Sequence, residues 1–286
     1  MAEGTYTLNI SCPDRVGIVA GVGTFLAKRN AWITEANHFA DRASGRFFMR
    51  QMLLANSLEI SSEAFEAEFR PIADEFDMEY RLTDNRIKKK VIVLVSKLGH
   101  CLADFLSRWK SGDYDVEIPC VISNHETMRE MVEWYGVPFI PIPVSRETKS
   151  VAFEQMEEIF DRYSPDLIVL ARYMQVFPEK VCRKYWGKVM NIHHSFLPSF
   201  IGAKPYHQAF DRGVKMTGAT CHYITSDLDA GPIIEQCITR VAHVHTATDM
   251  VRIGRDAEVQ ALAQGITYHL EDRVFIRNNR TIVFYQ

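Results

Sequence analysis

The 286-residue sequence lacks the features of membrane, secreted and nucleic-acid-binding proteins. No apolar run approaches the roughly 20 residues that a membrane-spanning helix needs, and the N-terminus has no basic segment followed by an apolar one. The net charge is −3, so the excess of basic residues that a polyanionic partner would require is missing. We therefore expect a cytoplasmic protein whose partners include neither nucleic acid nor a membrane.

Cysteine and histidine spacing argues against the common disulfide and metal frameworks. None of the six cysteines belongs to a C-x-x-C pair, and the sequence has no H-x-x-x-H pattern. His194, His207 and His222 gather near His193 along the chain, but the adjacent His193 and His194 point in opposite directions on a strand. We expect reduced, buried thiols and no bound metal.

Strand and helix patterns alternate through residues 1–82 in the order βαββαβ. The strands show period-two alternation or apolar runs, and the first helix has apolar residues three and four apart. We expect Ser62 to cap the second helix. The pattern predicts a ferredoxin-like domain with elements at Thr5–Ser11, Val16–Lys28, Asn30–Phe39, Arg46–Leu54, Ser62–Glu75 and Met78–Leu82.

The first turn of this domain, Pro13-Asp14-Arg15-Val16-Gly17-Ile18, resembles the opening of an ACT domain. Gly17 permits close backbone approach, and a helix start offers free N–H groups to a carboxylate. Two simpler interpretations stay open: the domain only mediates assembly, and Asp14 only caps the helix. The resemblance implies a homo-oligomer and a small amino-acid effector bound by Asp14, Arg15, Val16, Gly17 and Ile18.

Residues 83–90 are polar and charged, and we expect them to link the first domain to a second one spanning residues 91–286. The second domain opens with the continuous apolar run Val91–Ser96, which is typical of a buried parallel strand. Strand and helix patterns then alternate, which predicts an α/β fold with a doubly wound, mostly parallel sheet. We expect Asp115–Ile122 to form a single strand and residues 200–207 to form a loop beside the site. We expect Gly218–Ile224 and Pro232–Cys237 as antiparallel additions and Arg280–Phe284 as the final strand.

Polar residues follow the apolar pair Val189-Met190 near the expected end of a strand. Asn191 and His193 lie two positions apart, so their side chains point the same way. Ligands of open α/β sheets bind beyond the carboxyl ends of the strands, where Asp229 of a later segment can join this pair. An amide, an imidazole and a carboxylate can stabilise an oxyanion and activate a nucleophile, which suits acyl transfer or hydrolysis.

The motif Asn191-Ile-His193-His-Ser-Phe-Leu-Pro198, with Asp227-Leu-Asp229-Ala-Gly231-Pro232 further on, resembles the folate-dependent formyltransferases. Residues 200–209 narrow the resemblance to formyltetrahydrofolate deformylases. It implies hydrolysis of 10-formyltetrahydrofolate to formate and tetrahydrofolate, which supplies formate and balances one-carbon folate pools for purine synthesis. It also implies that Asn191 and His193 hold the oxyanion while Asp229 positions and activates water, with Asp227 as the competing carboxylate.

The same resemblance implies that the pterin binds at the loop after the central strand. Tyr173, Met174 and Val176 could form an apolar wall there, although core packing would also explain them. Lys204 is a candidate contact for the glutamate tail. We expect no permanently bound cofactor. The expected substrate-binding residues are Ile140, Arg172, Tyr173, Met174, Gln175, Val176, Gly202, Lys204, Ser226, Asp227, Leu228 and Gly231.

The loop at residues 96–101, after the first strand of the second domain, helps to indicate which molecule accepts the formyl group. It lacks the G-x-G-x-x-G pattern of nucleotide-binding loops. In ribonucleotide formyltransferases the corresponding loop is rich in Gly, Ser and Asn and holds the acceptor's phosphate, whereas this loop has a single glycine with Lys97, Leu98 and His100. Water is the expected acceptor, although Lys97 and His100 could still meet an anion.

Two alternatives to hydrolysis stay in view. Formyl transfer to an amine would use the same three catalytic residues. An amino-acid-sensing regulatory protein with an inert second domain would not need Asn191, His193 and Asp229 together, so their presence argues against it.

Overall fold

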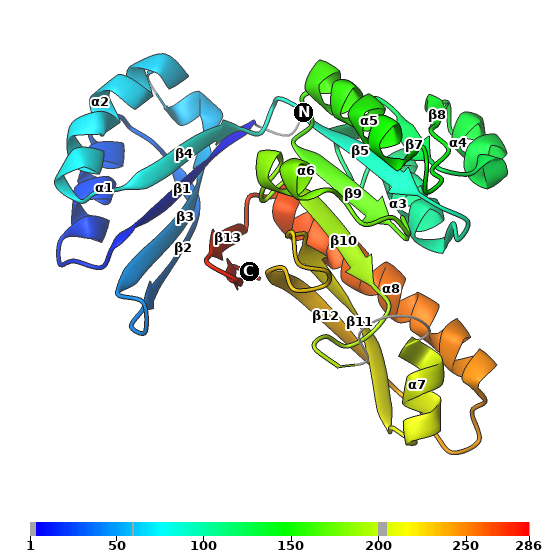
Figure 1. The fold of residues 1–286 in the computed structure, drawn as a ribbon. Coiled ribbons are helices and arrows are strands. Elements are labelled where there is room, and N and C mark those ends of the chain that lie inside the picture. The colour runs from blue at the N-terminus through cyan, green and yellow to red at the C-terminus, as the bar shows by residue number, and fades with distance from the viewer. Residues whose placement is uncertain (1–3, 59, 200–204, 286) are drawn as a thin grey trace. The chain divides into compact units, whose positions relative to one another are not determined.

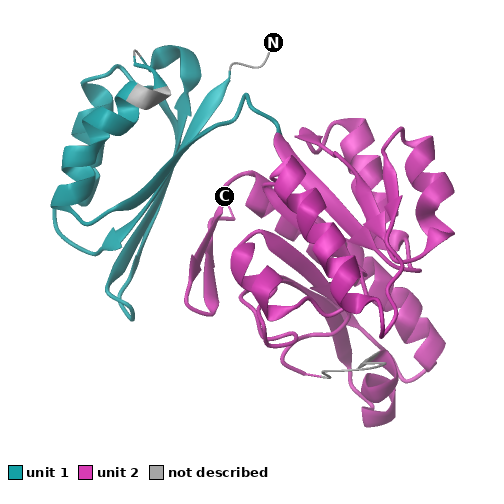
Figure 2. Cartoon of the chain, turned by 45° about the horizontal axis from the view of Figure 1, so that its top comes forward, with its two compact units in different colours: residues 1–88 teal, residues 89–286 magenta. Residues whose placement is uncertain are grey.

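The computed structural model describes residues 4–58, 60–199 and 205–285 and divides the chain into two compact units, residues 1–88 and 89–286 (Figure 2). Of the residues predicted to form a linker, 83 and 84 belong to the last strand of the first unit, and 89 and 90 belong to the first strand of the second. No helix in the described ranges is long and apolar enough to span a membrane.

The first unit is a four-stranded antiparallel sheet with two helices on one face (Figure 1). The predicted order βαββαβ is confirmed, and the strands lie in the order β2-β3-β1-β4. Phe25, Phe65 and Phe69 pack together beneath the helices, with ring centroids 5.0–5.4 Å apart. The elements are β1 Thr5–Pro13, α1 Ile18–Ala27, β2 Ile33–Asp41, β3 Arg46–Leu54, η1 Ala55–Ser57, α2 Ser62–Glu75 and β4 Glu79–Asp84.

The second unit is built on one large sheet in the order β12-β11-β10-β9-β5-β7-β8, with β6 beside β5 (Figure 1). Strands β5 to β10 pair in parallel, while β11 and β12 join antiparallel at one edge. The predicted mostly parallel sheet is therefore confirmed. The strands are β5 Lys89–Val95, β6 Val116–Glu117, β7 Val121–Ser123, β8 Phe139–Pro141, β9 Leu167–Ala171, β10 Val189–His193, β11 Met216–Tyr223 and β12 Ile233–Arg240.

Helices cover both faces of this sheet because its central strands are apolar on both sides. Val91, Val93 and Val95 of β5 belong to the core with α3 and α8, whereas Ile92 and Leu94 belong to the core with α5 and α6. The carboxyl ends of β5, β9 and β10 therefore meet between two helical layers. The helices are α3 His100–Ser111, η2 Glu126–Met128, α4 Arg129–Trp134, α5 Lys149–Tyr163, α6 Glu179–Lys184, α7 Pro205–Arg212 and α8 Ala247–Leu270.

Some local predictions were wrong. The cap of α2 is Ser61 and not Ser62, because the Ser61 hydroxyl accepts the hydrogen bond from Ala64 N. The single strand expected over residues 115–122 divides into β6 and β7 around Pro119, which has no N–H to donate to a ladder. The loop expected up to His207 already contains the start of α7. The C-terminal strand β14 Arg280–Val283 pairs with an unforeseen strand, β13 Val274–Arg277.

Candidate active site

The end of β10 brings two of the predicted catalytic residues to the carboxyl edge of the large sheet. Asn191 is the third residue of β10, and His193 is its last. Asp229 lies on the loop between β11 and β12, with a φ of 55°. Aspartate tolerates this left-handed conformation better than most residues with a side chain. The turn directs the Asp229 carboxylate toward β10.

His193 and Asp229 form the centre of the site. Asp229 Oδ1 lies 3.1 Å from His193 Nδ1, and the two side chains are 8% and 6% exposed. A carboxylate only accepts hydrogen bonds, so Nδ1 carries the proton of this contact. His193 Nε2 is buried and has no hydrogen-bond partner within the described part of the chain. The ring therefore has one nitrogen fixed by Asp229 and the other available to a substrate.

His222, opposite Asn191 in the β10–β11 register, fixes the Asn191 amide. The backbone carbonyl of Tyr223 lies 2.8 Å from His222 Nδ1 and only accepts, so Nδ1–H donates to it. Burial lowers the pKa of His222, which keeps the ring neutral. His222 Nε2 then accepts from Asn191 Nδ2 at 3.2 Å. This contact orients the amide and leaves the second Nδ2–H of Asn191 for another acceptor.

Charges around the site keep Asp229 ionised. Burial would raise the pKa of Asp229, but the hydrogen bond from His193 and the neighbouring histidines outweigh that effect and leave the pKa below its usual value. His194 follows His193 but behaves differently. Burial, together with the positive charge of Arg172, lowers the pKa of His194 to about 4. At neutral pH the site therefore has an ionised carboxylate beside two neutral histidines, His194 and His222.

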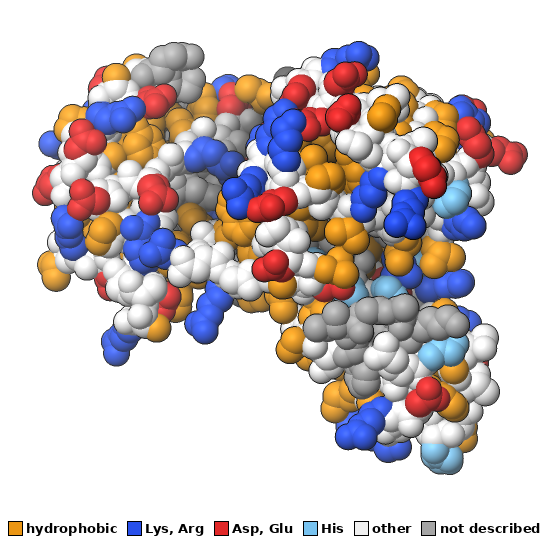
Figure 3. Space-filling view, viewed as in Figure 1, with side chains coloured by type: hydrophobic (Ala, Val, Ile, Leu, Met, Phe, Trp, Pro, Cys, Tyr) orange, Lys and Arg blue, Asp and Glu red, His pale blue; other side chains and the backbone are white. Residues whose placement is uncertain are grey.

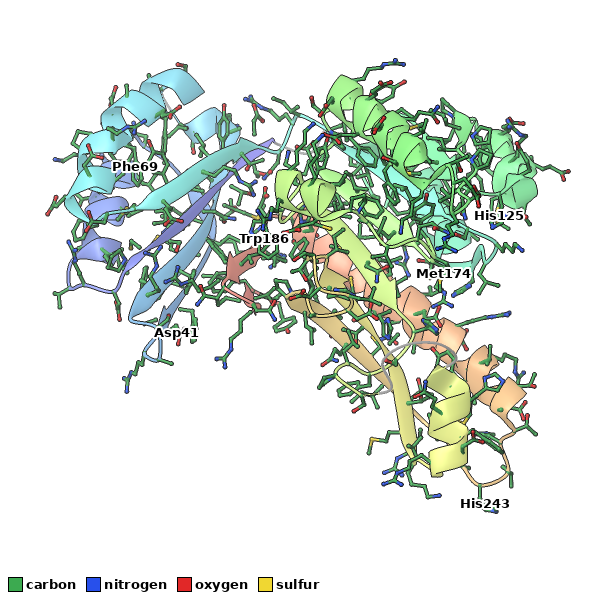
Figure 4. All side chains as sticks on the ribbon, viewed as in Figure 1. Asp41, Phe69, His125, Met174, Trp186 and His243 are labelled. Atoms are coloured by element: carbon green, nitrogen blue, oxygen red, sulfur yellow. The ribbon has the colours of Figure 1, made fainter. Side chains whose placement is uncertain are left out.

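A cavity of about 430 Å³ opens beside these residues. Met174 (Figure 4), Val176 and Leu228 are about half exposed and give it an apolar border, and Figure 3 shows histidine side chains (pale blue) next to apolar ones (orange) on the second unit. A largely apolar cavity with a few convergent polar groups is typical of a small-molecule site. Its described lining is Leu170, Arg172, Tyr173, Met174, Gln175, Val176, Phe177, Asn191, Ile192, His193, His194, His222, Ile224, Thr225, Asp227, Leu228 and Asp229.

The cavity brings together most, but not all, of the residues expected at the site. The three catalytic candidates line it, as do residues 172–176, Asp227 and Leu228. Ile140, Ser226 and Gly231 are not among its described lining residues, and Gly202 and Lys204 lie outside the described residues. Ile140 packs instead against the core shared with α5 and α6.

Gly231 has a backbone role in the loop that carries Asp229. A Cβ atom at this position would lie 1.8 Å from the Tyr223 carbonyl oxygen. Pro232 O accepts a hydrogen bond from Tyr223 N at 3.0 Å. Glycine is therefore needed for the close approach that holds the loop against the end of β11.

The structure contains one set of candidate metal ligands within its described residues, and it lies outside the cavity lining. The donor atoms of His100, Cys101 and Glu258 lie within 4.8 Å of one another. Glu258 is already hydrogen-bonded to His100, at 2.7 Å, and lies beside the positive charge of Arg172. Burial raises the pKa of the Cys101 thiol and so disfavours the thiolate that a metal would need. This set fits a hydrogen-bonded cluster better than a cation site.

The five effector candidates lie at the turn between β1 and α1. Gly17 is the N-cap of α1 and has a φ of 101°, a conformation that favours glycine. No side chain caps this helix, so Asp14 is not its cap. Arg15 pairs with Asp77 at 2.7 Å, Val16 is fully exposed, and Ile18 is buried in the core.

Comparison with known proteins identifies the family. The Formyl transferase model matches residues 89–266. A curated formyltetrahydrofolate deformylase from a Corynebacterium species is 45% identical over 278 residues, which cover 97% of this chain and 97% of the relative. One from Bacillus subtilis is 43% identical over 283 residues, which cover 99% of this chain and 94% of the relative. A crystal structure of a formyltetrahydrofolate deformylase from Pseudomonas syringae pv. tomato is 52% identical with a TM-score of 0.97, covering 99% of this chain and 95% of that one. Since the similarity extends through both units, the chain belongs to the formyltetrahydrofolate deformylase family.

Proposed function

We propose that this protein hydrolyses 10-formyltetrahydrofolate to formate and tetrahydrofolate. The observation that supports this most strongly is the convergence of Asn191, His193 and Asp229 at one end of a cavity large enough for a small ligand, with His193 Nε2 buried and unpartnered among the described residues. Hydrolysis needs an oxyanion site and a carboxylate to handle the proton of water, and these residues supply both.

The proposed reaction begins with water held by Asp229. The water oxygen bonds to the formyl carbon, and its proton passes to the carboxylate oxygen that does not contact His193. The free Nδ2–H of Asn191 and the Nε2–H of His193 donate to the resulting oxyanion. Because Nδ1 already donates to Asp229, a proton on Nε2 makes the ring an imidazolium, whose charge also stabilises the oxyanion. The carbon–N10 bond then breaks, N10 takes the proton held by Asp229, and the formic acid released loses its remaining proton to solvent to give formate.

The folate is proposed to lie along residues 172–176. Tyr173 and Phe177 are buried beneath this loop, so its backbone is held firmly while Met174 and Val176 remain exposed to a ligand. Asp227 and Leu228 face it from the other loop. The backbone N–H and C=O groups of residues 172–176 would form hydrogen bonds with the polar edge of the pterin, and the apolar side chains would cover its faces.

We also propose that the first unit is an ACT-type module that binds a small amino acid at the turn of residues 14–18 and takes part in a homo-oligomer. The left-handed Gly17 and the uncapped start of α1 support this, because they leave backbone N–H groups at an exposed turn. In the cytoplasm, such an enzyme would supply formate and balance one-carbon folate pools for purine synthesis. Neither nucleic acid nor a membrane is proposed as a partner.

The test is to incubate the purified protein with 10-formyltetrahydrofolate in the absence of any amine and to measure formate and tetrahydrofolate. Equal release of both over many turnovers is the expected result. Release only after an amine is added would instead identify a formyltransferase.

A further inference from the structure

A second group of polar side chains lies beside the catalytic residues, centred on Glu258 of α8. The Glu258 side chain is only 2% exposed, and His100 Nε2 lies 2.7 Å from its Oε2. The Tyr206 hydroxyl donates to Oε1 at 2.9 Å. Arg172 Nε lies 3.4 Å from Oε2, and the Arg172 side chain is 8% exposed. We call these four residues the Glu258 cluster.

The Glu258 cluster adjoins the catalytic end of the cavity. The His194 ring lies 5.2 Å from that of His193 and 6.1 Å from that of Tyr206, measured between centroids. Arg172 lines the cavity itself, and its charge is the largest electrostatic influence on the pKa of His194. The cluster therefore lies close to the reacting groups, with the His194 ring near both Tyr206 and His193.

Arg172 belongs to both the cluster and the folate loop, whereas their other side chains lie on opposite faces of the sheet. Tyr173 and Phe177 pack in the core with α5 and α6, whereas His100 and Glu258 belong to α3 and α8. No described residue of the cavity lining comes from α3 or α8. The cavity thus offers space on one side of the catalytic residues, while hydrogen-bonded and ion-paired side chains fill the other side.

Arg172 occupies its place in the cluster despite an unfavourable backbone conformation and buried donors without hydrogen-bond partners. Its backbone is left-handed, with a φ of 64°, which is uncommon for a residue with a long side chain. Its Nε and Nη1 atoms are both buried and have no hydrogen-bond partner among the described residues, so the 3.4 Å contact of Nε with Glu258 is an ion pair and not a hydrogen bond. Unfavourable conformations and unsatisfied donors persist mainly where function requires them.

Resting on the hydrolysis proposed above, we propose that Arg172 is a specificity-determining residue that selects water as the nucleophile. The Glu258 cluster fixes its side chain in the space that the substituent of an amine acceptor would occupy. Water has no substituent and needs no such space, so it reaches the formyl carbon from the cavity. The volume of the Arg172 side chain, and not its charge, provides the exclusion.

Opening this space should allow transfer to an amine. The amine nitrogen would bond to the formyl carbon, the carbon–N10 bond would break, and the proton lost by the amine would pass to N10. The products would be an N-formyl amine and tetrahydrofolate, and no oxidant or reductant is involved.

The experiment compares Arg172→Ala and Arg172→Met, both combined with Glu258→Gln so that no buried charge loses its partner. Glu258→Gln alone is the reference, and Arg255→Ala, at an exposed position of α8, is the matched control. Each protein receives ¹³C-formyl substrate and glycinamide, and NMR gives the ratio of N-formylglycinamide to formate. This ratio does not depend on how fast the variant works.

In the unmodified protein, the reference, the control and the methionine variant, we expect N-formylglycinamide only at the level that forms without enzyme. The first three keep the volume of Arg172, and methionine refills the space in the fourth. The alanine variant should raise the N-formyl fraction about tenfold or more above that level, the lower end of what one group contributes to discrimination in a pocket. An unchanged ratio in the folded alanine variant would overturn the inference. An equal rise with methionine would also overturn it, because charge would then be the cause.

The unmodified protein provides a test that does not depend on the folding of any variant. N-formylglycinamide formed by it at high glycinamide concentration would refute the exclusion while leaving folate cleavage intact. Absence of all folate cleavage would instead refute the proposed function. Recording total turnover together with the product ratio separates these two failures.

Discussion

Asp229→Asn tests the catalytic assignment with little disturbance of the backbone. Asparagine matches aspartate in shape and also tolerates the left-handed conformation at this position, where φ is 55°. The change removes the negative charge that lies 3.1 Å from His193 Nδ1. We therefore expect the fold and the folate cavity to persist while catalysis fails.

The expected loss follows from the two roles of this carboxylate. A general base contributes about 10²–10⁴ in rate, and removing the charge behind a catalytic histidine costs about 10⁴ in serine proteases. The Asp229 side chain is 8% exposed, so bulk water cannot easily replace it. We expect kcat to fall about 10³–10⁴-fold, which is about 4–5.5 kcal/mol in the barrier. KM should change little, because residues 172–176 remain in place.

The assay measures formate release over a range of substrate concentrations, with Asp227→Asn analysed in parallel because Asp227 is the rival carboxylate. Circular dichroism and thermal unfolding show whether each variant is folded. A folded Asp229→Asn variant that retains more than about a tenth of normal turnover would refute the assignment, since one general base alone contributes about 10²–10⁴. A larger loss with Asp227→Asn would transfer the role to that residue.

Three further changes test other parts of the site. Asn191→Ala should lower kcat about 10²–10³-fold through loss of an oxyanion donor, and an effect on KM alone would contradict this. Gly231→Ala places a Cβ 1.8 Å from Tyr223 O, so the thermal midpoint should fall, and an unchanged midpoint would show that the loop does not need this approach. His194 has a pKa of about 4 against an ordinary 6.5, so the unfolded state binds more protons between these pH values. The free energy of unfolding that the neutral His194 supports is therefore fully present above pH 6.5. It decreases as the pH falls toward 4, by at most about 3 kcal/mol. His194→Gln should flatten the dependence of the unfolding free energy on pH in this window. His243→Gln, at an exposed site (Figure 4), is the control and should leave that dependence unchanged. Equal slopes in both variants would count against the lowered pKa of His194.

Sequence patterns predicted most of the fold because the signals are local. The strand β5 is apolar on both faces, which period-based reasoning recognises as a buried parallel strand. The pair Asn191 and His193 was predictable for the same reason, since alternation along one strand sets their common direction. The start of α7 was missed because it follows directly on a segment that resembles a loop.

The parts of the site that depend on contacts between distant segments could not be predicted. His222 meets Asn191 only through the β10–β11 register, which no local pattern specifies. Glu258 lies within a long helix whose amphipathic pattern gives no sign that one carboxylate is buried. Its partner His100 was considered a residue that could bind an anion, and in the structure His100 forms a hydrogen bond with Glu258. Ile140 was placed at the site by resemblance; it is not among the described residues that line the cavity, and it packs, partly buried, against the core.

The central claim is that water attacks the formyl group directly at Asn191, His193 and Asp229. The most direct measurement is a single turnover with excess enzyme and ¹³C-formyl substrate, stopped by acid at successive times. The label is then measured in substrate, in free formate and on the protein. The account predicts that label passes from substrate to formate and that the protein never carries it. A formyl group covalently attached to the protein, for example at His194, would contradict the account.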